Sequence, residues 1–146
     1  MLKKAVQPAK AIKMRGKKMG QALILVGHGA GEEALVFYRM LAEDIRREYS
    51  YTWLAMLHGE PTAEEAAKEA SEAGVKKALI LPLLLAPGLH LSKNIAAEDS
   101  EIRRAFSQAG IETEVINEGL LQAPPMREAV AAHCLKAIGK STDFKD

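Results

Sequence analysis

From Ala22 onward, short apolar runs alternate along the chain with stretches that have helical spacing. Four runs have the length and composition of buried strands, namely Leu23–Gly27, Thr52–Leu57, Ala78–Leu83 and Glu112–Asn117. Strands that alternate with helices are typical of βα units, whose right-handed crossovers place helices on both faces of a sheet. The pattern therefore predicts an α/β fold, a three-layer sandwich in which helices flank a four-stranded parallel sheet.

Helix signals lie between and after these runs. Four helices are predicted, over Gly31–Glu48, Thr62–Gly74, Ala97–Ala109 and Pro124–Gly139. Thr62 followed by Glu65 is a capping-box pattern at the start of the second helix. The first helix has an apolar stripe, expected to lie mostly in the core, that consists of Ala34, Phe37, Tyr38, Leu41 and Ile45.

Composition favours one globular domain. The 146 residues are 48% hydrophobic and 27% charged, which argues against a disordered chain. The longest apolar run, Ala78–Pro87, is too short to cross a bilayer as a helix, so we expect no membrane partner. The only cysteine, Cys134, excludes an intrachain disulfide and fits a reducing cytoplasm. Because it lies within a predicted helix, we expect Cys134 to be a packed hydrophobe.

Charge is distributed unevenly along the chain. The first twenty residues contain seven lysines and arginines and no acid, so the rest carries −6. We expect residues 1–20 to be a basic, solvated arm, 21–140 a single domain and 141–146 a tail. Aromatic residues make up only 5% of the chain, so stacking platforms for nucleic acid are missing and no nucleic-acid partner is expected.

Three of the four histidines follow the first three predicted strands. His28, His58 and His90 would meet where the carboxyl ends of neighbouring parallel strands converge, which is where α/β folds place their chemistry. Neutral imidazoles bind divalent transition metals, so the sequence predicts one shared metal site. His133, in the last helix, is expected to be a surface or packing residue.

Other interpretations of these loops stay open. A single loop histidine is more often structural than functional, and His28 could be a turn residue between flexible glycines. The segment Gly27–Gly31 could hold a phosphorylated ligand, as in a flavodoxin-like regulatory module, although it lacks the G-x-G-x-x-G spacing and the P-loop lysine.

Two segments carry a family resemblance. Leu25–Ala30, with the sequence LVGHGA, and Leu81–His90, with LPLLLAPGLH, resemble the signature segments of class II chelatases of the sirohydrochlorin cobaltochelatase family. The likeness is greater to the carboxyl half of the two-domain anaerobic cobaltochelatases and covers about Ala22 to Ile138. It continues through Ala96–Ser100, Glu118–Leu120 and Pro125–Glu128.

The resemblance implies a chelatase-like fold and a reaction. A divalent metal, with Co²⁺ favoured and Fe²⁺ or Ni²⁺ as alternatives, would be inserted into sirohydrochlorin or a related reduced tetrapyrrole, with no organic cofactor. His28 and His90 match the two family histidines that hold the metal and act in catalysis. His58 stands where the two-domain enzymes have a glutamate ligand, and Asn94 stands where related sequences often have an aspartate.

Further groups are candidates for this chemistry. Lys93 and Arg127, expected in loops near the site, would bind the carboxylates of the tetrapyrrole. Loss of two pyrrole protons requires a base, for which the candidates are His28, Glu60, Glu32 and Glu33.

The resemblance also implies an assembly. The two-domain relatives bind the tetrapyrrole between two α/β halves, and this chain has residues for one half, so we expect a symmetric homodimer. The apolar stretch Leu81–Leu91 supports a second wall, since it has more leucines than a βα loop usually exposes. A noncatalytic metal or tetrapyrrole carrier on the same fold stays an alternative.

Overall fold

The computed structural model describes residues 20–29 and 31–141. Its four strands form one parallel sheet, and they are β1 (Gln21–Gly29), β2 (Thr52–His58), β3 (Lys77–Pro82) and β4 (Glu112–Val115). The strand order β2-β1-β3-β4 places β1 between β2 and β3. The predicted α/β class and the parallel four-stranded sheet are confirmed.

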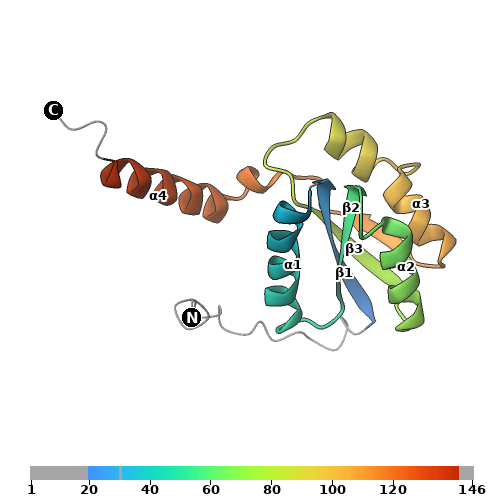
Figure 1. Ribbon diagram of the computed structural model, residues 1–146. Helices are drawn as coiled ribbons and strands as arrows, with labels where there is room; N and C mark the ends of the chain where they lie inside the picture. The colour runs from blue at the N-terminus through green and yellow to red at the C-terminus, as the bar shows by residue number, and fades with distance from the viewer. Residues whose placement is uncertain (1–19, 30, 142–146) are drawn as a thin grey trace.

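Four α-helices and two shorter helical segments connect and follow the strands. They are α1 (Glu32–Arg46), α2 (Ala63–Glu72), the π-helix η3 (His90–Ala96), α3 (Glu101–Gln108), the 3₁₀-helix η4 (Leu120–Gln122) and α4 (Pro124–Lys140). Figure 1 shows α1 on one face of the sheet, α2 and α3 on the other, and α4 projecting away from the rest. Among the described residues, every helix is too short or too polar to be a candidate for spanning a bilayer.

The two faces of the sheet are covered unequally. On the side of α2 and α3, Ile24 and Val26 of β1 belong to a large cluster with the fully buried Phe106. On the side of α1, Leu25 packs in a small cluster whose other buried members are Ala42, Leu54 and Met56. Alternate residues of β1 therefore contribute to two cores, as expected for a central strand covered on both faces.

The third helix starts later than predicted. Ser100 begins α3, because its Oγ accepts a hydrogen bond from the Arg103 amide (3.2 Å) and donates one to the Ile95 carbonyl (2.9 Å). The preceding residues form the separate π-helix η3. The fourth strand is also shorter than predicted and ends at Val115, where its pairing with Ile80 stops.

Two predictions about buried side chains are wrong. The stripe of α1 was expected mostly in the core, yet Phe37 is 68% and Leu41 39% exposed, and within this fully described helix only Ala42 is buried. Cys134 was expected to be packed and is exposed. Helix α4 extends away from the sheet (Figure 1), so within its own chain it neither covers the apolar stripe of α1 nor buries Cys134.

The predicted basic arm, residues 1–20, lies outside the described residues except for Gly20, as does the predicted tail except for Ser141.

The cap of α2 yields a stability prediction. The Thr62 hydroxyl accepts a hydrogen bond from the Glu65 amide (3.1 Å), which satisfies a helix-terminal N–H. We expect Thr62→Ala to lower the free energy of unfolding by about 1 kcal/mol. Urea denaturation at matched protein concentration measures the change. Thr62→Ser keeps the acceptor and is the control, so equal losses in the two variants would contradict the capping role.

Candidate functional site

The carboxyl ends of β1, β2 and β3 carry the three predicted histidines. His28 lies next to the last residue of β1, His58 ends β2, and His90 begins η3 after β3. Since β1 is the middle strand of the three, His28 lies between the other two. The sheet order therefore brings together residues that are more than 60 positions apart in the chain.

The imidazole of His28 lies in contact range of the other two. The ring centroids of His28 and His58 are 5.1 Å apart, and those of His28 and His90 are 4.4 Å apart. The ring planes meet at 77° and 75°, which are edge-to-face arrangements. All three residues are exposed. In this arrangement no three His, Cys, Asp or Glu side chains of residues 20–29 and 31–141 could already hold a metal ion together.

Two glycines allow the strands to approach closely at this edge. A Cβ on Gly27 would lie 2.8 Å from the Met56 and Tyr38 side chains, and one on Gly29 would lie 3.0 Å from the Cβ of His58. Because Gly29 pairs with His58 in the sheet, a larger residue there would push the second histidine away from the first. Gly27 is thus required by packing against Met56 and Tyr38, and Gly29 by packing against His58.

A π-helix holds the third imidazole. Leu91 and Ile95, both almost fully buried, fix η3 to the core and leave His90 on its exposed side. The Nδ1 of His90 lies 3.2 Å from Oδ1 of Asn94, one turn further along. An amide oxygen only accepts, so the His90 tautomer that makes this hydrogen bond carries its proton on Nδ1 and leaves the lone pair of Nε2 free for a metal.

Asn94 is the group that the sequence interpretation undervalued. In the sequence, Asn94 stands out only because related sequences often have an aspartate there. The structure shows that the amide oxygen of Asn94 lies within hydrogen-bond distance of Nδ1 of His90. The signal in the sequence was the spacing of four residues between His90 and Asn94, which places two side chains on one side of a helix.

The two predicted cations do not lie in loops. Lys93 is an exposed residue of η3, three positions after His90. Arg127 lies in the first turn of α4, and its Nη1 donates hydrogen bonds to the carbonyls of Leu121 (2.8 Å) and Gln122 (3.1 Å). These bonds stabilise the turn into α4. Binding of substrate by Lys93 and Arg127 stays a prediction.

The three candidate bases besides His28 are exposed residues near the ends of the same strands. Glu60 follows β2, and Glu32 and Glu33 form the first turn of α1. Acidic residues in a first turn also stabilise the helix through its dipole.

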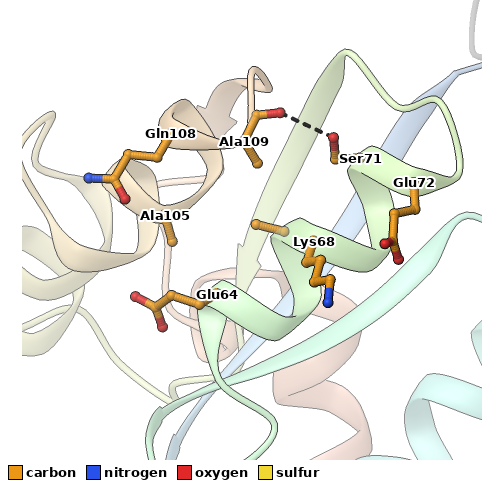
Figure 2. A pocket seen from close by; sticks show the side chains of 8 residues that line it. Glu64, Lys68, Ser71, Glu72, Ala105, Gln108 and Ala109 are labelled. Carbon is orange, nitrogen blue, oxygen red and sulfur yellow. Dashed lines mark hydrogen bonds between the residues drawn. The ribbon is translucent and has the colours of Figure 1, made fainter.

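A separate hollow of about 330 Å³ lies between α2 and α3 (Figure 2). Its lining includes Glu64, Lys68 and Gln108, and Ser71 donates a hydrogen bond across it to the Ala109 carbonyl (3.2 Å). None of the described histidines lines it. The chemistry that the sequence predicts is therefore located at the sheet edge and not in this hollow.

Comparison with known proteins gives the same family as the sequence motifs. A family match described as cobalt chelatase (CbiK) covers residues 2–139. The sirohydrochlorin cobaltochelatase CbiKC of Nitratidesulfovibrio vulgaris is 30% identical over 86 residues, which are 59% of this chain and 30% of the relative. The sirohydrochlorin cobaltochelatase of Methanocaldococcus jannaschii is 35% identical over 82 residues, 51% of this chain and 55% of the relative.

More distant matches cover more of the chain. The sirohydrochlorin cobaltochelatase of Salmonella typhimurium is 23% identical over 131 residues, 89% of this chain and 50% of the relative. The matched parts thus span about a third to a half of these relatives. A solved structure of a CbiX protein from Marinobacter aquaeolei has a TM-score of 0.70 and 24% identity, covers 83% of this chain and 99% of its own, and supports the fold. On the match over residues 2–139, the chain belongs to the cobalt chelatase (CbiK) family.

Proposed function

We propose that this chain inserts a divalent metal ion into sirohydrochlorin or a related reduced tetrapyrrole, with Co²⁺ favoured and Fe²⁺ or Ni²⁺ as alternatives. The observation that carries the proposal is the cluster of His28, His58 and His90 at one edge of the sheet. Family membership supports the reaction, and the relatives named above are sirohydrochlorin cobaltochelatases. The single cysteine of the chain supports a reducing cytoplasm as its location.

In this proposal the imidazoles bind the metal substrate transiently. His90 presents Nε2, since Nδ1 is engaged with Asn94, and His28 is close to both other rings. The side chains are exposed, so ring rotation that brings the nitrogens onto one ion meets little steric resistance. Few and exchangeable nitrogen ligands suit a site that has to release its metal.

Insertion must also remove two protons from the ring. The ion replaces two pyrrole N–H protons, so one M²⁺ enters and two H⁺ leave, and charge is conserved. An imidazole that is not occupied by the metal can accept such a proton, and Glu60, Glu32 and Glu33 are further acceptors close to the strand ends. Lys93 and Arg127 would pair with the carboxylates of the tetrapyrrole.

We propose in addition that the chain acts as a symmetric homodimer. The histidines lie at an open edge, and a flat macrocycle bound there by one copy would keep one side in solvent. Leu85 (63% exposed) and Leu89 (64%) precede His90 and offer apolar contacts for a second copy. The rest of the predicted apolar stretch contributes less, because Leu91 is buried and Leu84 is half-buried.

The metal site is tested by single alanine variants. We expect His28→Ala and His90→Ala each to weaken Co²⁺ binding about tenfold or more, because each removes one of three nitrogen ligands. Isothermal titration with Co²⁺ measures affinity, and the absorbance of sirohydrochlorin measures insertion under anaerobic conditions. His58→Ala tests the third ligand, and His133→Ala on α4 is the matched control.

Two results of these assays would change the proposal. Unaltered Co²⁺ affinity in both the His28 and the His90 variants would contradict the shared site. Tight Co²⁺ binding by the unaltered protein without any change in the tetrapyrrole spectrum would favour the noncatalytic carrier.

The hydrogen bond from His90 to Asn94 yields a separate prediction. Asn94→Ala removes the acceptor that holds the ring, so we expect about a tenfold loss of Co²⁺ affinity, which is typical of groups behind a metal ligand. Asn94→Asp keeps an acceptor oxygen at the same place and should restore the affinity. If the aspartate variant binds as weakly as the alanine variant, the oxygen does not orient His90.

The homodimer is tested by light scattering at micromolar concentration. We expect a mass near twice the 15.9 kDa of the chain. Leu85→Asp combined with Leu89→Asp should weaken association, because charge replaces apolar contact next to the histidines. A monomer mass for the unaltered protein throughout a dilution series would contradict the dimer.

A further inference from the structure

The π-helix η3 is attached to the protein differently from the strands. His28 and His58 belong to strands whose backbones are hydrogen-bonded to each other in the sheet. His90 begins η3, which follows β3 after the connecting residues 83–89. The place of the His90 imidazole relative to the other two rings therefore depends on the contacts that attach η3 to the body.

Apolar packing holds one side of η3. Leu91 and Ile95 are almost fully buried and belong to the large cluster around Phe106. Burial of this kind stabilises strongly but has no preferred direction. A π-turn is rare, and it differs from an α-turn only in closing one residue later. Apolar contacts by themselves therefore do not fix the rotation and register of η3.

Two side chains from the start of α3 bind the last carbonyls of η3. The Oγ of the buried Ser100 donates a hydrogen bond to the Ile95 carbonyl (2.9 Å). The Nη1 of Arg103 donates one to the Ala96 carbonyl (2.9 Å). Carbonyls at the end of a helix lack partners within the helix. These two donors satisfy the carbonyls of the residues at which η3 ends.

Arg103 also reaches the sheet. Its Nε donates a hydrogen bond to Oγ1 of Thr113 (3.0 Å), and its Nη2 donates one to the Thr113 carbonyl (3.0 Å). Thr113 lies in β4 and pairs with Ala78 of β3, which in turn pairs with Ala22 of β1. One guanidinium group therefore links the end of η3 to the frame of strands that carries His28.

The chemistry of the guanidinium group suits such a link. Its N–H groups lie in one plane at fixed angles, so the three bonds of Arg103 restrict rotation as well as distance. Hydrogen bonds from an ionised donor are about twice as strong as those between neutral groups. The link therefore adds to η3 the direction that apolar burial lacks.

We infer that Arg103 is a positioning residue for the candidate metal site, since it fixes η3 to β4 and thereby fixes the His90 imidazole relative to His28. His90 and Asn94 are exposed residues of the helix that Arg103 holds. The ring centroids of His90 and His28 are 4.4 Å apart, so a small rotation of η3 changes their contact. The inference rests on the proposed function, because it names a residue that prepares the same site for its metal.

The first test observes the His90 ring in the metal-free protein. Nitrogen NMR shifts of an imidazole distinguish protonation on Nδ1 from protonation on Nε2. We expect Arg103→Met to move the His90 shifts, because η3 then turns and the contact with Asn94 loosens, and to leave those of His133 unchanged. Arg104→Met removes the same charge from an exposed neighbouring position of α3 and is the matched control. Unchanged His90 shifts in a folded Arg103→Met protein would overturn the inference.

The second test determines whether Arg103 acts through His90. We expect Arg103→Met to weaken Co²⁺ binding about tenfold in isothermal titration, as is typical when a group behind a metal ligand is lost. In a protein that already carries His90→Ala, the same change should have no further effect on Co²⁺ affinity, because the ligand that Arg103 positions is gone. Its effect on the free energy of unfolding should be the same in both backgrounds. Equal losses of Co²⁺ affinity with and without His90 would show a merely structural role and overturn the inference.

A pair of variants at Thr113 keeps the inference testable if Arg103→Met unfolds the protein. Thr113→Val removes the Oγ1 acceptor with little change in shape, whereas Thr113→Ser keeps a hydroxyl. We expect Thr113→Val to move the His90 shifts in the same direction as Arg103→Met but by less, because two of the three bonds remain. Thr113→Ser should leave the shifts unchanged. Equal shifts in the two Thr113 variants would contradict the link to β4.

The outcomes separate this inference from the proposed function. If the unaltered chain does not bind Co²⁺, the proposed metal site is wrong, and the metal-free shifts of His90 still decide whether Arg103 positions the ring. If Co²⁺ binds and the Arg103 and Thr113 variants change neither the shifts nor the affinity, the positioning role is wrong and the proposed function stands. Thr62→Ala lowers stability at α2 and should leave Co²⁺ affinity unchanged, which controls for stability loss alone.

Discussion

The central position of β1 is the constraint on which the candidate site depends. This strand forms parallel ladders with β2 on one side and β3 on the other, so the carboxyl ends of all three meet at one edge. His28 thereby lies between His58 and His90. A shift of one residue in either ladder would turn every side chain of a strand to the other face. The two cores of β1 oppose such a shift, because Ile24 and Leu25 are both fully buried on opposite sides.

Close packing of the backbone at this edge brings the converging histidine side chains into contact. Gly29 lets β1 and β2 approach until no room is left for a side chain beside His58. On the other side, Leu91 fixes η3 in the core, and Asn94 holds the ring of His90 through Nδ1. The geometry of the candidate site therefore depends on backbone spacing and on one polar contact to the ring of His90, and the three imidazoles themselves are exposed.

The two faces of the sheet differ in how completely one copy covers them. The α2 and α3 side contains the large cluster around Phe106, whereas α1 buries only Ala42 fully and presents Phe37 to solvent. The turn at Leu120, bonded to the carbonyl of Leu84, directs α4 away from the face that it could cover.

Much of the fold and part of the site follow from the sequence by itself. Apolar periodicity and caps such as Thr62 are local properties, so the four strands, most helix boundaries and the order of elements were predicted correctly. The order of elements along the chain was also enough to predict that His28, His58 and His90 lie at the ends of successive strands. Periodicity does not say what covers an apolar face, and for this reason the exposure of Phe37 and Cys134 was missed. The strand order and the path of α4 depend on packing between residues that are distant in the chain, so only the tertiary structure decided them.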